Sequence, residues 1–382
     1  MFGFMKKNVG KTLLVLSVGV LFSCFDSKKS DTIVIGNYGS MTGSEATFGL
    51  STRDGILLAM EQLNAQGGIN GKKVELKVYD NQGKPEEARL SVEKLINVDN
   101  VVAILGEVAS TRSLAAAPVA QQYKVPMISP SSTNPEVTKK GDYIFRVCFI
   151  DPFQGSVMAK FAFNSLKLKK AVILRDSKSD YSVGLADYFI KTFTTELTGS
   201  IVADEKYQSG DVDFKAQLTS IKGKDFDFIF LPGYYTEVGL LARQARELGI
   251  TKPILGGDGW DSPTLFEVGG DALNNTYISN HFSPDDPRPE VVAYVKTYKE
   301  RFGVVPDGLS SAGYDAANVL FAAMKKAPSL KGEDLRNAIA DTKNFPGVTG
   351  LLSLNENRDA VKSAVILKIE NGKFNYLETV NP

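Results

Sequence analysis

Small hydroxyl side chains follow two stretches of this sequence that have the pattern of buried strands. The stretches are VVAILGE (101–107) and VPMI (125–128), and the hydroxyl residues are Ser110 and Thr111 after the first and Ser131, Ser132 and Thr133 after the second. At the start of a helix, hydroxyl groups and free backbone N–H groups bind a carboxylate. The same residues also suit helix N-caps and ordinary turns, so their spacing alone leaves both interpretations open.

An acidic side chain, Asp258, lies between glycines in LGGDGW (255–260), where the backbone can approach a ligand closely. It is either a surface loop residue or, if it faces the hydroxyl groups, a partner for an ammonium group. Aromatic residues at loop positions could line a slot for an apolar or amide side chain, or pack between domains. They are Phe48, Tyr181, Tyr234, Tyr235 and Trp260. Together these residues predict a site for a small zwitterion.

The composition argues against several other functions. Lys and Arg total 44 and Asp and Glu total 44, so no basic excess is present to bind nucleic acid. A hydrolase could use Ser110 or Ser132 with Asp258, but we expect the single histidine, His281, near a domain crossover rather than beyond a strand end. No general base is then available, so the sequence predicts a protein that is not an enzyme and has no metal or cofactor.

Predicted strands and helices alternate along most of the chain, which is typical of βαβ units and parallel sheets. The pattern restarts near residue 150, which predicts an α/β protein with two doubly wound lobes. Strands are expected at 32–39, 74–80, 101–107, 171–176, 201–207, 226–233 and 253–259, and helices near 181–197, 213–222, 236–248, 287–302 and 309–326. A hairpin is expected near 370–372. Ligands bind beyond the carboxyl ends of parallel strands, where the polar and aromatic residues lie.

The N-terminus has the features of a targeting segment. Three lysines precede the apolar run 12–22, which is too short to span a bilayer. The run ends in LFSC (21–24), which resembles a bacterial lipobox, and this predicts a signal peptide over 1–24, a lipidated Cys24 and a tether over 25–31. A plain secretory signal with a coincidental cysteine is the alternative.

The chain resembles the periplasmic branched-chain amino-acid-binding proteins, the type I solute-binding family of ABC importers. The matching segments, spread over about 32–380, are MTGSEATFG (41–49), LNAQGGINGKKVEL (63–76), YDNQGKPEEA (79–88), MISPSSTNPEVT (127–138), GYYTEVGLLARQARELG (233–249) and LGGDGW (255–260). The resemblance implies a Venus-flytrap fold with two lobes and three crossovers. Lobe 1 would comprise 32–149 and 282–353, and lobe 2 would comprise 150–281 and 354–382.

The resemblance also implies roles for the residues named above. Ser110 and Thr133 would hold the carboxylate and amino group of an amino acid, helped by the Ser131 carbonyl, and Asp258 would anchor the ammonium where the leucine-binding members usually have glutamate. Tyr181 and Tyr234 match the cleft aromatics, and Phe48 falls in the side-chain pocket; Thr111, Ser132 and Trp260 complete the predicted ligand-binding set.

Together with the lipobox, the resemblance predicts a monomeric, lipid-anchored receptor that delivers its ligand to an ABC transporter permease. It would lie in the periplasm, or on the cell surface if the organism has a single membrane. Ligands of related members include amides, urea and aromatic acids. A ligand sensor that feeds a signalling receptor is a further alternative, which sequence cannot separate from transport.

Overall fold

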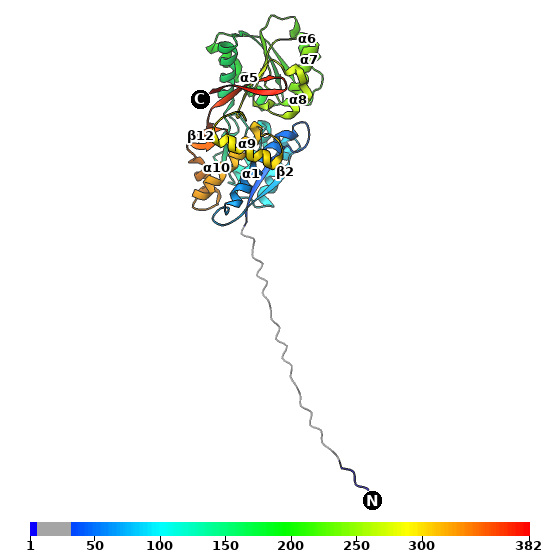
Figure 1. Cartoon of the computed structure of the whole chain (residues 1–382), viewed down its shortest axis with the longest axis vertical. Coiled ribbons are helices and arrows are strands. Elements are labelled where there is room, and N and C mark those ends of the chain that lie inside the picture. Colours follow the sequence, from blue (N-terminus) through cyan, green and yellow to red (C-terminus); the bar gives the residue numbers. More distant parts are fainter. Residues whose placement is uncertain (6–31) are drawn as a thin grey trace. The chain divides into compact units, whose positions relative to one another are not determined.

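The computed structural model describes residues 1–5 and 32–382. Apart from the first five residues, the predicted signal peptide, Cys24 and the predicted tether lie outside the described residues. Thr32–Pro382 form one compact unit, drawn in Figure 1. No helix within the described residues has both the length and the apolar character needed to cross a membrane.

The first sheet has five parallel strands in the order β2-β1-β3-β4-β5. Parallel pairing places the carboxyl ends of all five strands at one edge of the sheet. The strand that precedes Ser110 is much shorter than predicted, because only two residues of 101–107 pair as a strand. The bounds are β1 Ile33–Gly39, β2 Val74–Asp80, β3 Ile104–Leu105, β4 Met127–Ser129 and β5 Ile144–Arg146.

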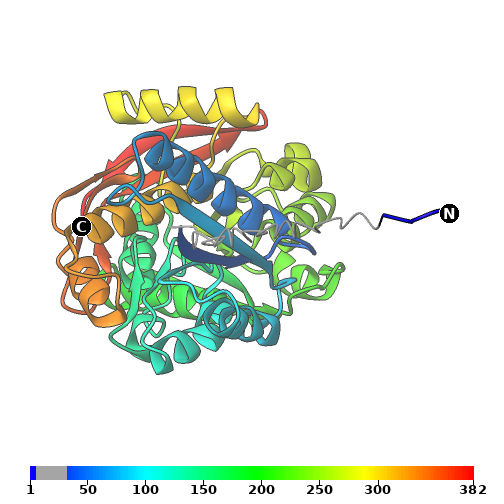
Figure 2. The ribbon, with the colours of Figure 1, turned by 90° about the horizontal axis from the view of Figure 1, so that it is seen from below.

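Helices cover both faces of this sheet, so its strands are apolar on both sides. Ile104 packs in one core with helices α2 and α3, and its neighbour Leu105 packs in another with α1, α10 and α11. Figure 2 shows these helices around the β1 strand. The bounds are α1 Ala46–Ala65, α2 Pro85–Asn97, α3 Ser110–Gln122, α9 Pro289–Phe302, α10 Gly308–Lys326 and α11 Gly332–Ala340.

Close contact between α1 and α10 fixes the start of α10, which contributes to the site described below. A Cβ atom on Gly55 would lie 1.9 Å from the backbone oxygen of Ser310, and one on Gly313 would lie 2.4 Å from the backbone oxygen of Thr52. Only glycine allows the two backbones to approach this closely. Asp307 caps α10 by accepting a hydrogen bond from the Ser310 N–H, at 2.7 Å.

The second sheet has seven strands in the order β15-β14-β10-β9-β8-β6-β7. The strands β6 to β10 are parallel, and β14 and β15 form an antiparallel hairpin on one edge. The turn of this hairpin is at residues 371–372, which confirms the predicted hairpin. The bounds are β6 Lys170–Asp176, β7 Ser200–Tyr207, β8 Phe228–Phe230, β9 Ile254–Gly256, β10 Thr276–Asn280, β14 Ala364–Glu370 and β15 Lys373–Val380.

Five α-helices and several shorter helices accompany the second sheet. Ser179 caps α5 by accepting a hydrogen bond from the Ser182 N–H at 3.2 Å, and this places Tyr181 in the first turn. The bounds are α4 Asp151–Lys160, η2 Phe161–Ser165, α5 Asp180–Lys191, η3 Thr192–Glu196, α6 Lys215–Lys222, α7 Tyr235–Glu247, η4 Asp258–Trp260, α8 Pro263–Gly269 and η5 Gly270–Leu273; η1, Thr138–Lys140, lies in the first lobe.

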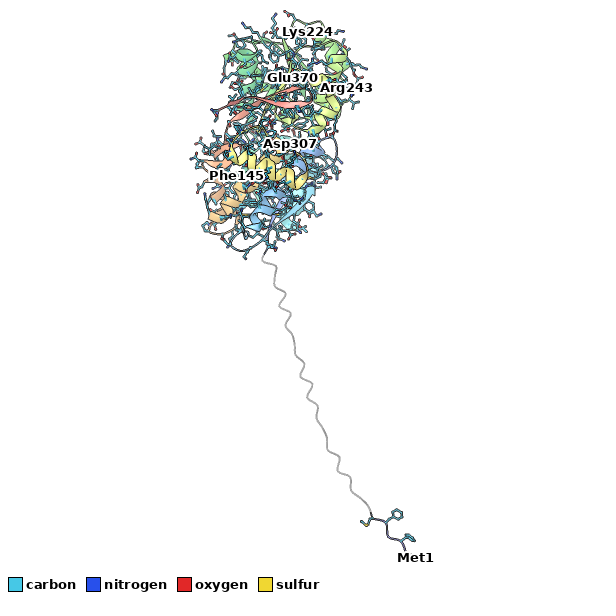
Figure 3. The ribbon with its side chains drawn as sticks, in the orientation of Figure 1. Met1, Phe145, Lys224, Arg243, Asp307 and Glu370 are labelled. Carbon is cyan, nitrogen blue, oxygen red and sulfur yellow. The ribbon has the colours of Figure 1, made fainter. Side chains whose placement is uncertain are left out.

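The two sheets are the centres of two doubly wound lobes that the chain connects three times, near 147–150, 281–288 and 362–363. In Figure 3, Phe145 labels the first lobe, Glu370 the second, and Asp307 lies where the two lobes meet. A small antiparallel sheet of β11 Phe345–Gly347, β12 Gly350–Leu354 and β13 Ala360–Val361 precedes the third connection.

The structure differs from the predicted lobe boundary at residue 354. Ala360 lies in the core of the first lobe, and β13 pairs with β12. Asp359 forms an ion pair with the fully buried Arg146 of β5, with 2.7 Å between Oδ1 and Nε. These contacts hold residues 354–361 on the first lobe, so the second lobe resumes with β14.

Candidate functional site

Asp258 lies at the start of η4, directly beyond strand β9, and is buried between the lobes. Its Oδ1 accepts hydrogen bonds from Gln154 Nε2 at 2.8 Å and from the Tyr181 hydroxyl at 3.0 Å. Its Oδ2 lies 3.0 Å from His281 Nε2 and accepts a hydrogen bond from Ser131 Oγ at 3.1 Å. Ser131 belongs to the first lobe, so this carboxylate connects the two lobes.

The surroundings of Asp258 keep it ionised. Burial alone would raise its pKa, but hydrogen bonds and charge from His281, together with hydrogen bonds from Gln154 and Tyr181, outweigh this effect and lower the pKa below its ordinary value. Burial also lowers the pKa of His281, and the contact with Asp258 offsets this only in part. The site therefore contains a buried carboxylate whose ionised form is stabilised by the groups around it.

Ser131, His281 and Asp258 are within hydrogen-bond distance of one another, but they do not form a hydrolase triad. Ser131 Oγ and Asp258 Oδ2 both face Nε2 of His281, at 3.1 and 3.0 Å. Nδ1 has no hydrogen-bond partner among the described residues. A triad requires the acid on one ring nitrogen and the nucleophile on the other, so the imidazole here cannot relay a proton. The prediction that His281 lies away from the strand ends is wrong, because it directly follows β10.

Ser110 and Thr111 are the first two residues of α3 rather than its N-cap. Ala109 occupies the cap position and no side chain caps the helix, so the capping interpretation is wrong. Ser110 Oγ accepts a hydrogen bond from the N–H of Asn134 at 3.2 Å. Thr111 Oγ1 accepts one from the N–H of Asp180, on the second lobe, at 3.0 Å.

The other hydroxyl residues follow β4 and have different environments. Ser132 Oγ contacts the Ser113 hydroxyl at 2.7 Å and the Val108 carbonyl at 3.0 Å, so it stabilises the loops of the first lobe from within. Thr133 is fully buried, and its hydroxyl has no hydrogen-bond partner in the part of the chain that the structure describes. Thr133 is therefore the hydroxyl in this loop that makes no hydrogen bond of ordinary geometry, and its nearby acceptor is the Asp151 carboxyl group, whose pKa it lowers.

A small cavity of about 10 Å³ lies beside Asp258, with room for about one water molecule. Aromatic rings form much of its wall. The Phe48 and Tyr234 rings meet edge to face with 5.2 Å between centroids, and Tyr181 and Tyr234 stack at 5.3 Å. The lining residues are Phe48, Val108, Ser131, Tyr181, Tyr234, Asp258, Gly259 and Leu309.

The structure places Trp260 outside this lining. Its indole is fully buried in the core of the second lobe, and Nε1 donates a hydrogen bond to the Leu231 carbonyl at 3.0 Å. The ring packs against Gly256, where an added Cβ would lie 2.3 Å from it. Trp260 thus supports the Asp258 loop from behind.

Direct hydrogen bonds also join the rims of the two lobes. The Thr47 N–H donates to the Tyr235 hydroxyl at 3.3 Å, and the Thr236 hydroxyl donates to the Ser44 carbonyl at 2.8 Å. Asn134 Nδ2 donates to the Asp180 carbonyl at 2.8 Å. The lobes are therefore in contact around the cavity, and a molecule the size of an amino acid can enter only after they separate.

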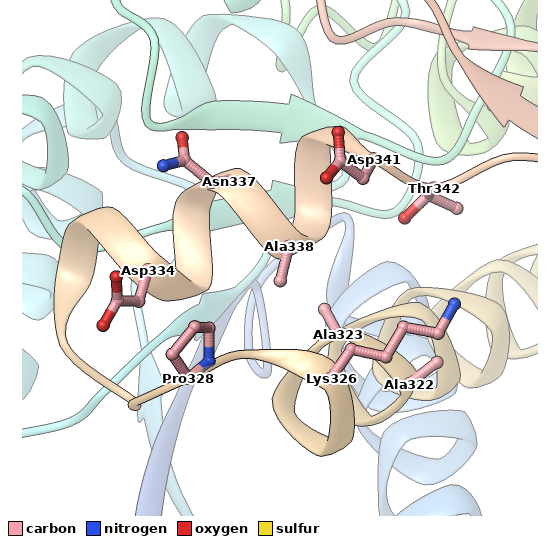
Figure 4. A pocket seen from close by; sticks show the side chains of 9 residues that line it. All are labelled: Ala322, Ala323, Lys326, Pro328, Asp334, Asn337, Ala338, Asp341 and Thr342. Atoms are coloured by element: carbon pink, nitrogen blue, oxygen red, sulfur yellow. The ribbon is translucent and has the colours of Figure 1, made fainter.

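Figure 4 shows a different pocket, of about 230 Å³, between α10 and α11. Lys326, Asp334 and Asp341 are among its lining residues. Every lining residue belongs to the first lobe, so movement of the lobes would not open or close it. Residues of both lobes line the smaller cavity, and five of them belong to the predicted ligand-binding set.

Five residues of the candidate site were not in the predicted set. His281 and Gln154 hold Asp258, and Val108, Gly259 and Leu309 line the cavity. Val108 could have been identified as a lining residue from its sequence position, because it lies just beyond a predicted strand and before Ser110. Gln154, Leu309 and His281 are recognisable only when the two lobes are placed together.

Comparison with known proteins supports an extracytoplasmic binding fold. The family described as periplasmic binding protein matches residues 32–373. A leucine-binding protein, LivK, from Thermotoga maritima is 41% identical, with a TM-score of 0.88 over 92% of this chain and 99% of that one. LivJ from Streptococcus pneumoniae, solved with isoleucine, is 36% identical, with a TM-score of 0.87 over 92% and 100%. A solute-binding protein from Rhodopseudomonas palustris, solved with 3,4-dihydroxybenzoic acid, is 27% identical, with a TM-score of 0.82 over 92% and 98%.

Proposed function

Because this chain belongs to the periplasmic binding protein family, we propose that it captures a branched-chain amino acid between its two lobes and delivers it to an ABC transporter. The observation that carries the proposal is the buried, ionised Asp258, which contacts both lobes and borders an apolar cavity. The similarity to the leucine-binding and isoleucine-bound proteins supports this class of ligand.

The contacts of Asp258 indicate how an ammonium group would bind. A carboxylate can accept about four hydrogen bonds, and the two oxygens of Asp258 already have four partners. A ligand ammonium must therefore displace one of them. Ser131 is the partner from the other lobe, and its hydroxyl can turn away without disturbing the second lobe. A ligand ammonium would replace the Ser131 hydroxyl at Oδ2 and hydrogen-bond to the Thr133 hydroxyl, and the carboxylate would lie at the start of α3 near Ser110.

Closure follows from this arrangement. A ligand that touches Asp258 on one lobe and Ser110 and Thr133 on the other binds the closed form more tightly than the open form. It therefore shifts the population toward the closed form by this difference in affinity. The transporter would recognise that form, and no bond in the ligand is made or broken.

The apolar lining predicts the ligand side chain. Phe48, Tyr234 and Leu309 offer no charge to a ligand, and burying an unpaired charge there is costly. A thermal-shift screen should therefore show stabilisation by leucine, isoleucine and valine, and little by lysine or glutamate. Ligand at 100 times its Kd contributes about 2.7 kcal/mol to the free energy of unfolding. Stabilisation only by 3,4-dihydroxybenzoic acid, or only by urea and amides, would contradict an amino-acid ligand.

We also propose that Cys24 carries a lipid anchor, because LFSC (21–24) resembles a lipobox. In the native host, Cys24→Ser should move the protein out of the membrane fraction and abolish incorporation of labelled palmitate. Cys148→Ser is the matched control, because Cys148 is a buried thiol of the folded unit and its replacement should leave the protein on the membrane. A Cys24→Ser protein that stays labelled and membrane-bound would contradict the anchor.

A sensor with the same ligand site is the alternative to a transport receptor. Copurification from the native host separates the two, because a transport receptor associates with a permease and a sensor with a signalling receptor.

A further inference from the structure

Asp151 is a buried acid next to the ligand site that the proposed function does not use. It is the first residue of α4 and is fully buried. Neither carboxyl oxygen makes a hydrogen bond of ordinary geometry among the described residues, although the Thr133 hydroxyl is close enough to act as a donor and to lower the pKa. A buried carboxylate without donors is strongly disfavoured, so such a group normally binds a proton or gains a cation.

Several contacts place Asp151 beside the position expected for the ligand ammonium. Its N–H donates to the Thr133 carbonyl at 2.9 Å, and its carboxyl group is close enough to the Thr133 hydroxyl and to Asp258 for both to affect its pKa. One turn further along α4, Gln154 donates to Asp258. The first turn of α4 therefore borders the same small region as Thr133 and Asp258.

The charged and titratable groups around Asp151 do not neutralise it as a carboxylate. Arg146, on β5, is already paired with Asp359. Asp258 is negative, and Tyr181, on α5, stays protonated because burial raises its pKa well above the usual value. Where α5 passes closest, it presents Gly184, which has no side chain to donate; a Cβ there would lie 3.3 Å from Oδ2 of Asp151.

We propose that Asp151 is uncharged in the ligand-free protein and releases its proton to the solvent when a ligand ammonium binds near Asp258 and Thr133. The inference rests on the proposed function, because it requires a cationic group at this position. The ammonium keeps its own protons, and the Asp151 O–H bond breaks to leave a carboxylate that faces the new positive charge. Asp151 is thus a positioning residue that makes ligand affinity depend on pH.

The sign of this dependence follows from the direction of the shift. The pKa of Asp151 is raised to about 8: burial raises it most and Asp258 adds to this effect, while the Thr133 hydroxyl and Arg146 lower it in part. Below this value the free protein carries the proton, and binding must expel it. Affinity should therefore rise with pH between about 6 and 8, by at most tenfold per pH unit for one proton.

Calorimetry with L-leucine at pH 7, in buffers of different ionisation enthalpy, tests the proposal. Wild-type protein should release close to one proton per ligand, and Asp151→Asn, which has the shape of the neutral acid, should release about one proton fewer. Subtracting the two proton counts cancels the contributions of other groups that titrate nearby, such as His281 and the buried Asp261. Binding with the same proton count in both proteins would overturn the inference and leave the proposed function intact. Failure of wild-type protein to bind L-leucine would instead contradict the proposed function.

A ligand-free measurement covers the case in which Asp151→Asn does not fold or leucine does not bind. The infrared difference spectrum between free wild-type protein and Asp151→Asn, or Asp151→Ser if the amide variant does not fold, should contain a protonated-carboxyl band at pH 6 that titrates away with a midpoint near pH 8. The difference is needed because other buried carboxyl groups, such as Asp261, also have raised pKa values. The inference fails if the difference spectrum contains no such band.

Discussion

Replacing Asp258 with alanine is expected to weaken amino-acid binding by about two to three orders of magnitude. Truncating one partner of a buried, hydrogen-bonded charge pair costs roughly 2–5 kcal/mol, and every 1.4 kcal/mol or so is a factor of ten in Kd. The change would also leave Gln154, Tyr181 and His281 without the acceptor that they share. Isothermal titration calorimetry with L-leucine measures the loss directly.

Two further variants separate the charge from the shape of this side chain. Asp258→Asn keeps the size and should lose most of the affinity, because the amide carries no charge. Asp258→Glu restores the acid usual in the leucine-binding members of the family and should retain binding. An unchanged Kd for Asp258→Ala, in a protein whose circular dichroism matches wild type, would refute the ammonium role.

Replacing Trp260 with alanine is expected to lower the free energy of unfolding by about 3–5 kcal/mol. The indole is fully buried in the core of the second lobe, and its removal leaves a large cavity beside Gly256. The Leu231 carbonyl would also lose the donor that lies 3.0 Å away. Urea denaturation followed by circular dichroism measures the change.

Trp260→Phe is the matched control, because it keeps most of the volume and removes the hydrogen bond. It should destabilise the protein less than alanine does and should change the Kd for L-leucine far less than Asp258→Ala. A Trp260→Ala protein of wild-type stability would show that the ring does not support the Asp258 loop. A Trp260→Phe protein with wild-type stability and a hundredfold loss of affinity would indicate direct contact with the ligand.

Much of the fold follows from local patterns in the sequence. The alternation of VELKVYD predicts β2 at its observed bounds, Val74–Asp80, and the proline at position 85 marks the first residue of α2. Two doubly wound lobes follow from the repeated βαβ pattern. These features depend on hydrophobic periodicity and on turn-forming residues. Both can be recognised from residues that are adjacent in the sequence.

Other features depend on contacts between distant segments. The run 101–107 is apolar up to its last residue, yet only Ile104–Leu105 pair as a strand, because pairing also needs partners in β1 and β4. The lobe boundary was misplaced for the same reason: Asp359 is held on the first lobe by Arg146, more than 200 positions earlier.

The site was predictable only in part. Asp258 and the hydroxyl residues lie beyond strand ends, and the structure brings Asp258 and Ser131 together. His281 was set aside because sequence position alone does not show that the end of β10 lies beside the Asp258 loop. Asp151 gave no signal, since an acid at the start of a helix is common and its burial between the lobes is a tertiary property.

The most direct measurement is a crystal structure of the protein grown with L-leucine. It should show the ligand enclosed by both lobes, its nitrogen about 3 Å from Asp258 Oδ2 in place of the Ser131 hydroxyl, and its carboxylate at the start of α3. Leucine bound on one lobe alone, or within the lobes but with its nitrogen away from Asp258, would contradict this account of recognition.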